Sequence, residues 1–199
     1  MTSPSCDEKE ELIKRFIQAG LVNGQITFYI TIEVGNTTAL AEKFPSSLFL
    51  FICNPRADII VKNLPNVFKM KGIENLTDID IALIKSFRMF DNSQSGPKRA
   101  CIEIISDVLL QHHAVTTRKW LSGLLPELKT KGFTTLAVIN PQMHPQEEVQ
   151  AISGLFEGEI RITEKDAEKG PEKILRIRKL YNQRYIDTEF VLTREKLEI

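Results

Sequence analysis

The sequence predicts an α/β protein with a mainly parallel RecA-like sheet flanked by helices and an antiparallel β extension at the carboxyl end. Two observations favour the parallel sheet. Short apolar runs alternate with amphipathic helical segments up to residue 156. These runs carry few charges, as expected of strands that are covered on both faces. The third observation concerns residues 157–199, where apolar and polar residues alternate or pair in the manner of antiparallel strands.

The individual elements follow from hydrophobic periodicity and from turn residues. Helical spacing of apolar residues predicts helices in five segments, at residues 8–22, 37–43, 75–90, 115–130 and 144–156. Apolar and β-branched runs between turn signals predict strands in five segments, at residues 26–33, 47–53, 66–72, 100–107 and 133–140. Residues 91–99 are polar and contain glycine and proline, which predicts a loop before the fourth strand.

Composition limits the classes of function. A chain of 199 residues with 42% hydrophobic residues can bury a core, and we expect a single domain over residues 1–199. Lys plus Arg equals Asp plus Glu at 26 each, and this zero net charge argues against a nucleic-acid partner. No apolar run approaches the roughly 18 residues of a membrane span, and the first residues are too polar for the apolar core that we would expect of a signal peptide. We therefore expect a cytoplasmic protein.

Two polar side chains end predicted strands that follow each other along the chain. The run IEIISD ends on Asp107, and TTLAVIN ends on Asn140. Because the carboxyl ends of parallel strands meet at one edge of a sheet, we expect these side chains at the edge where α/β folds bind ligands. Asp107 could hold Mg²⁺ through water, or it could only cap the turn that follows its strand.

These segments resemble the RecA/KaiC-like ATPase superfamily, in particular archaeal KaiC-like domain proteins, over nearly the whole chain. The stretch EELIKRFIQAGLVNGQITFYITIE is similar to the helix after the phosphate loop and the strand that ends in a catalytic glutamate. The resemblance implies that Glu33 polarises the attacking water and that Asp107 is the Walker B acid. It also implies that Asn140 is the polar sensor at the end of the next strand. A second family acid is replaced here by Val34.

The segment KILRIRKLYNQRY is similar to the family's LRI-K-M-R segment, whose Lys and Arg reach the nucleotide across a subunit boundary. Lys179 matches the Lys, while Tyr181 stands where the Arg would be. The resemblance therefore implies a homo-oligomer, or assembly with a related RecA-like subunit, in which Lys179 contacts phosphates in trans.

The phosphate loop of the superfamily is poorly matched. Residues 3–16 lie over the pattern of Gly, four residues and Gly-Lys-Ser/Thr, and only Lys9 fits it. Glutamates at positions 8 and 10 replace the glycine before the Lys and the hydroxyl that binds Mg²⁺. Glycines let the backbone approach phosphates, and nearby carboxylates repel them. We expect a degenerate phosphate loop over residues 1–10, and the sequence also allows this segment to be disordered.

A strand precedes the phosphate loop in this superfamily, but here only two residues precede Ser3. Either the chain is an N-terminally shortened form of a longer protein, which we favour, or its sheet lacks that strand. In the first case the missing strand would fill an interior place in the sheet. In the second case the sheet would have no strand at that place.

The sequence leads to one main hypothesis of function and two alternatives. We expect a non-hydrolysing protein that acts as a regulatory or scaffold subunit, through self-association or by binding an unidentified protein partner. The first alternative is a nucleotide-dependent switch or slow ATPase with ATP and Mg²⁺, which would use Lys9, Glu33 and Asp107. The second is a recombination accessory factor that binds single-stranded DNA.

Overall fold

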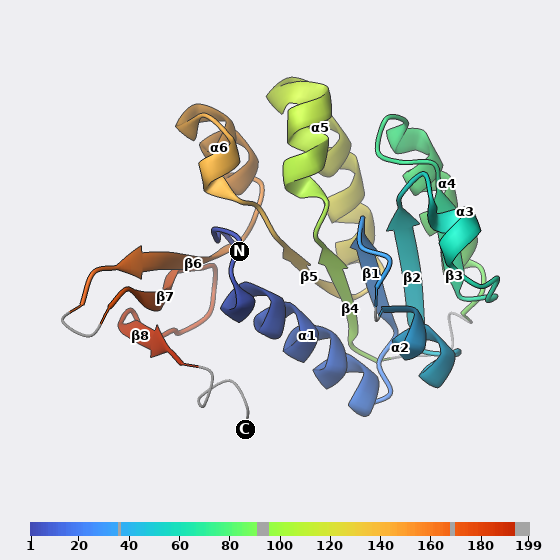
Figure 1. Cartoon of the computed structure of the whole chain (residues 1–199), viewed down its shortest axis with the longest axis horizontal. Coiled ribbons are helices and arrows are strands. Elements are labelled where there is room, and N and C mark those ends of the chain that lie inside the picture. The colour runs from blue at the N-terminus through green and yellow to red at the C-terminus, as the bar shows by residue number, and fades with distance from the viewer. Residues whose placement is uncertain (36, 91–95, 168–169, 194–199) are drawn as a thin grey trace.

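The computed structural model describes residues 1–35, 37–90, 96–167 and 170–193, and Figure 1 shows their arrangement. The predicted loop at 91–99 and the predicted extension at 157–199 thus lie partly outside the described residues. The helices are α1 (Asp7–Val22), α2 (Thr37–Lys43), α3 (Ala57–Ile60), α4 (Leu76–Phe87), α5 (Ile105–Thr130) and α6 (Gln146–Ser153). The strands are β1 (Thr27–Thr31), β2 (Leu48–Cys53), β3 (Val67–Met70), β4 (Lys98–Ile102), β5 (Phe133–Ala137), β6 (Gly158–Lys165), β7 (Glu172–Leu180) and β8 (Glu189–Leu192).

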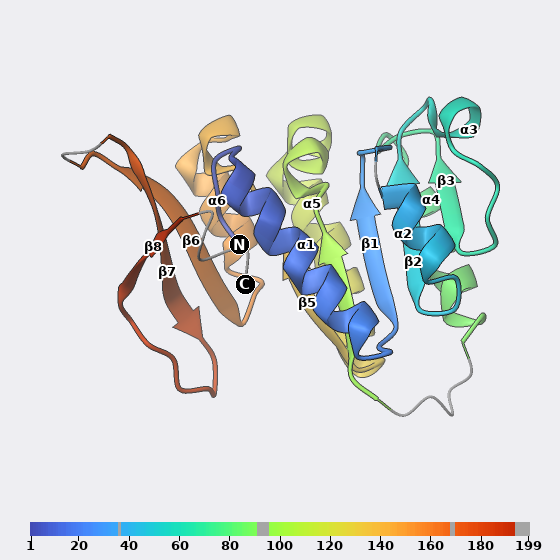
Figure 2. The ribbon, with the colours of Figure 1, turned by 60° about the horizontal axis from the view of Figure 1, so that its bottom comes forward.

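The strands form two sheets, which confirms the predicted fold class. The first five strands make a parallel sheet in the order β3-β2-β1-β4-β5, and the last three make an antiparallel sheet in the order β6-β7-β8. Helices α1, α2 and α3 cover one face of the parallel sheet, and α4, α5 and α6 lie on the other (Figures 1 and 2). None of the described helices is long and apolar enough to cross a membrane.

The parallel sheet has a separate core on each face because side chains alternate along a strand. Phe28 and Ile30 of β1 lie in the core under α4 and α5. Tyr29 faces the other core, which contains Ile13 and Ile17 of α1. All residues of β1 and β2 are buried, which explains why both strands read as nearly uninterrupted apolar runs.

The predicted strand at residues 100–107 is wrong in its extent. Strand β4 ends at Ile102, and α5 begins at Ile105 and runs to Thr130. Asp107 therefore lies in the first turn of α5 and not at the end of a strand. The apolar run continues past the strand because the start of α5 is buried as deeply as β4.

Helix α5 contains a break at His113. This residue has φ 57° and ψ 170°, a backbone conformation that only glycine adopts readily, while the flanking segments are helical. The carbonyl of His113 accepts a hydrogen bond from Thr117 Oγ1 at 2.8 Å, and His112 Nε2 lies 2.7 Å from the carbonyl oxygen of Ile73. These contacts hold the break in place, although the His113 side chain itself is exposed.

We expect His113→Gly to raise the free energy of unfolding by about 1 kcal/mol, because glycine removes the steric cost of the positive φ. Gln111→Gly, in the regular part of α5, is the matched control and should lower it by about 1 kcal/mol. Urea unfolding followed by circular dichroism measures both changes. A loss of stability in His113→Gly would contradict the strain at this residue.

The amino-terminal residues lie between the two sheets and pair with both, and α1 begins within residues 1–10. Thr2 forms parallel β-bridges with Ile139, just after β5, and with Arg161 of β6. Thr2 and Ser3 are buried, and α1 begins at Asp7. A segment of three residues thus occupies the space between β5 and β6.

Candidate functional site

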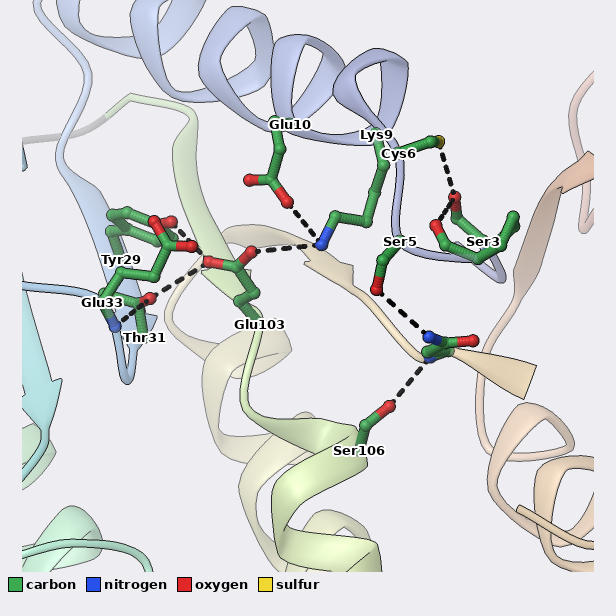
Figure 3. Close-up of polar contacts among 12 residues, drawn as sticks. Ser3, Ser5, Cys6, Lys9, Glu10, Tyr29, Thr31, Glu33, Glu103 and Ser106 are labelled. Atoms are coloured by element: carbon green, nitrogen blue, oxygen red, sulfur yellow. Dashed lines mark hydrogen bonds and ion pairs between the residues drawn. The ribbon is translucent and has the colours of Figure 1, made fainter. Parts of the chain in front are cut away.

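Glu103, which directly follows β4, is the centre of a buried polar network (Figure 3). Its Oε2 accepts hydrogen bonds from Tyr29 Oη at 2.5 Å and from Thr31 Oγ1 at 3.1 Å. Tyr29 and Thr31 lie on the neighbouring strand β1, and the backbone N–H of Glu103 donates to the Ile30 carbonyl. The parallel pairing of β1 and β4 therefore fixes the position of this carboxylate.

The ammonium group of Lys9 lies between two carboxylates at the start of α1. Lys9 Nζ is 2.5 Å from Glu10 Oε1 and 3.7 Å from Glu103 Oε1. The Lys9 and Glu103 side chains are only 14% and 10% exposed, so water screens this attraction weakly. Figure 3 shows the lysine side chain directed from α1 toward the end of β4.

Glu33, two residues beyond the end of β1, completes a cluster with Lys9, Glu10 and Glu103. One carboxylate oxygen from each of Glu10, Glu33 and Glu103 lies within 4.8 Å of the others. The backbone N–H of Glu33 donates to Thr31 Oγ1 at 3.0 Å, which links this residue to the Glu103 network. The structure thus brings together two of the predicted site residues, Lys9 and Glu33, with two acids that were not assigned to the site.

The pKa values in this cluster follow from crowding and burial. The pKa of Glu33 is raised, first by desolvation and then by repulsion from Glu103 and Glu10. Burial tends to lower the pKa of Lys9, but the nearby glutamates outweigh this effect and raise it. Lys9 therefore stays charged and partly neutralises the three acids.

The segment between Thr2 and α1 does not form an anion cradle. Ser3 Oγ donates to the carbonyl of Pro4 at 2.7 Å and lies 3.6 Å from Cys6 Sγ. Pro4 has no N–H group to offer a ligand. In the part of the chain that is described, positive φ occurs at His113, Asn182 and four glycines, all outside residues 3–10. A nest of backbone N–H groups requires such φ values.

Asp107 lies in a different environment from the cluster. Burial raises its pKa, and its own backbone N–H and the nearby His144 oppose that shift. Burial first and the charge of Asp107 second raise the pKa of the Cys53 thiol at the end of β2 to about 12. The charges of His144 and, more weakly, of Lys9 in the cluster thus act on Asp107.

Asn140 and Lys179, the remaining predicted site residues, are held by other partners. The Asn140 backbone N–H donates to Ser106 Oγ at 2.8 Å, and its side-chain Nδ2 donates to Ser5 Oγ at 3.3 Å. Lys179 lies on β7, where its Nζ donates to the Phe156 carbonyl at 2.9 Å. Among the described residues, Lys179 makes no hydrogen bond or ion pair with Lys9, Glu33 or Glu103, and its implied role concerned a neighbouring subunit.

Sequence reasoning missed Glu103 and treated Glu10 only as a source of repulsion. The available signal was the alternation in ACIEI, where one charged residue interrupts an otherwise buried run. A charge within such a run is stable only with partners, and those partners are Tyr29 and Thr31 on the adjacent strand.

Comparisons with known proteins support the fold. No family model matches the chain, and no curated protein does. Among solved structures, the KaiC-like protein PH0186 from the hyperthermophilic archaeon Pyrococcus horikoshii OT3 matches with a TM-score of 0.64 and 14% sequence identity. The match covers 96% of this chain and 83% of that protein. Together with the parallel sheet and its antiparallel extension, this likeness shows that the chain has a RecA/KaiC-like fold.

Proposed function

We propose that this protein is a non-hydrolysing member of the RecA/KaiC-like group that acts as a regulatory or scaffold subunit, through self-association or by binding a protein partner. The observation that carries the proposal is the pairing of Lys9 with Glu10 and Glu103. The lysine that would bind phosphate in an active relative is already neutralised by acids of this chain.

ATP and Mg²⁺ fit these residues poorly. Glu103, at the strand end, already accepts hydrogen bonds from Tyr29 and Thr31 and lies near the Lys9 ammonium. A metal ion there would be repelled by that ammonium, and a triphosphate would be repelled by Glu10 and Glu33. The segment 3–6 supplies no backbone cradle that could offset this repulsion.

An interaction role is supported by apolar side chains that are exposed on helices beyond the carboxyl ends of the strands. Ile59 and Ile60 of α3 are 87% and 60% exposed, and Val115 of α5 is 83% exposed. Helix α3 follows β2, and Val115 lies just after the break of α5 at His113. Ile59 and Ile60 are adjacent in the chain, and a contiguous exposed apolar patch favours contact with another protein surface.

The proposal predicts that ATP with Mg²⁺ leaves the melting temperature unchanged at millimolar concentration. A ligand at 100 times its Kd would stabilise the native state by about 2.7 kcal/mol, an effect that a thermal scan detects easily. The Glu10→Ser, Glu33→Gln double variant is the control, because it removes two of the three acids and restores a hydroxyl after Lys9. A gain of binding in the control with none in the wild type supports the proposal.

The same measurement of melting temperature with ATP and Mg²⁺ tests the alternative of a nucleotide-dependent switch or slow ATPase. The convergence of Lys9 and Glu33 with an acid at the end of β4 favours this alternative. In that case Glu103, and not Asp107, would take the strand-end role. If ATP and Mg²⁺ stabilised the wild-type protein and Lys9→Ala abolished that stabilisation, the result would contradict the main proposal and support the switch.

A further inference from the structure

Helix α4 presents exposed apolar side chains on the face that points away from the parallel sheet. The helix packs on β2 and on the edge strand β3, at the outer side of the sheet (Figure 1). Its buried face consists of Ile79, Ala82, Leu83, Ser86 and Phe87. Ile81 and Ile84 lie on the opposite face, three residues apart, and are 45% and 43% exposed. Two neighbouring isoleucines thus form the middle of an exposed helix face.

The rotation of α4 about its own axis is held by a contact with α5. Trp120 Nε1 of α5 donates to Asp80 Oδ1 at 2.9 Å, which ties one flank of α4 to the rest of the molecule. Successive residues of a helix turn by about 100°, so Asp78 and Lys85 share the flank away from Asp80. This free flank borders the two exposed isoleucines.

Charged side chains are sorted along the exposed face of α4. Asp78 lies in the first turn of the helix, and Lys85 lies in the last turn. Glu74 just before the helix and Arg88 just after it extend the same polarity, and all four side chains are exposed. Within the described part of the chain, none of the four forms an ion pair. The face is therefore acidic at its amino end, apolar in the middle and basic at its carboxyl end.

Such a face is complementary to itself. The helix dipole alone would favour acids at the amino end and bases at the carboxyl end, but it gives no reason for exposed isoleucines between them. A second α4, packed antiparallel about a two-fold axis between Ile81 and Ile84, accounts for both features. The isoleucines of the two copies then pack together, and Asp78 lies opposite the partner subunit's Lys85 at both ends.

We propose that α4 forms a two-fold symmetric interface with a second copy of this chain, in which the two helices run antiparallel, Ile81 and Ile84 form the apolar centre, and Asp78 pairs with the partner's Lys85. A pair of three-turn helices is smaller than a standard interface of about 1,600 Å², so we expect a dissociation constant in the micromolar range.

This interface specifies the self-association named in the proposed function and rests on the proposed function to that extent. It makes no use of the Lys9 cluster. A protein that stays monomeric and does not respond to ATP would overturn the interface and leave the non-hydrolysing, partner-binding role standing. A dimeric protein that ATP and Mg²⁺ stabilise would do the reverse.

Charge reversal tests the interface in the full chain, with sedimentation velocity from low micromolar to submillimolar concentration. Asp78→Lys alone places two lysines opposite each other at both ends, and Lys85→Asp alone places two aspartates there. Each variant by itself should dimerise at least about tenfold more weakly than the wild type. An equimolar mixture of the two should recover the affinity to within about threefold of the wild type, because every lysine then meets an aspartate.

Lys14→Asp on α1, at the opposite face of the sheet, is the matched control with the same change of charge, and it should dimerise like the wild type. Circular dichroism checks that each variant is folded. A monomeric wild type, or a mixture of Asp78→Lys and Lys85→Asp that stays monomeric, would overturn the proposal. Dimerisation that both reversals leave unchanged would assign self-association to another surface and also overturn it.

Discussion

Phe28→Ala is expected to lower the free energy of unfolding by about 4 kcal/mol, which is a large share of the 5–15 kcal/mol typical of a domain. Phe28 is fully buried in the middle of β1. Its ring lies 4.6–6.0 Å, between centroids, from five other aromatic rings, those of Phe49, Phe51, Phe87, Phe90 and Phe133. These rings come from β2, from β5 and from the end of α4 and the residues that follow it, so they cannot all move to fill the cavity.

Phe28→Leu is the control for this cavity and should cost about 1–2 kcal/mol, because leucine fills most of the volume that alanine leaves empty. Chemical unfolding monitored by the fluorescence of Trp120 measures both variants. Similar costs for the two substitutions would mean that the aromatic cluster rearranges around a smaller side chain. That result would contradict a tightly packed core under α4.

Glu103→Ala is expected to cost about 3 kcal/mol, since it leaves the buried Tyr29 and Thr31 hydroxyls without their acceptor and removes one partner of Lys9. Glu103→Gln keeps an oxygen acceptor and should cost about half as much. In a double-mutant cycle, Tyr29→Phe should cost less in the Glu103→Ala background than in the wild type. Purely additive costs would show that the short hydrogen bond contributes nothing specific.

The pH dependence of stability provides a second readout for Glu103. The folded-state pKa of Glu33 is raised above its unfolded value, so its contribution is most favourable below the unfolded pKa and is lost as pH rises through the folded pKa. Because Glu33 is exposed, solvent screening limits this effect to a few tenths of a kcal/mol. In Glu103→Ala one repulsive neighbour is gone, so stability should fall less between about pH 4 and pH 6.

Most of the fold could be predicted because its strands and helices carry simple patterns. Strands β1 and β2 are fully buried and read as apolar runs, while α1 and α4 show one apolar face each. Asn75 caps α4 as expected, since its side chain accepts a hydrogen bond from the Thr77 N–H. Local chemistry determines these features, and local sequence reveals them.

The end of β4 could not be predicted for a physical reason. A buried strand followed by a buried helical turn gives one continuous apolar run, and periodicity cannot divide a run that is apolar throughout. The boundary depends on tertiary pairing, because Glu103 is hydrogen-bonded to Tyr29 and Thr31 of β1. The predicted strand was therefore extended five residues too far, to Asp107, which lies in the first turn of α5. The bridges of Thr2 to both sheets were equally invisible, because they join residues far apart in sequence.

The three residues before Pro4 also bear on how the molecule melts. Backbone hydrogen bonds of Met1, Thr2 and Ser3 tie the antiparallel sheet to the parallel one. Fraying of this short tether would let the sheet of β6, β7 and β8 detach while the larger core persists. Calorimetric cooperativity would then depend on these three residues, so that loss of their backbone hydrogen bonds would turn one heat-absorption peak into two.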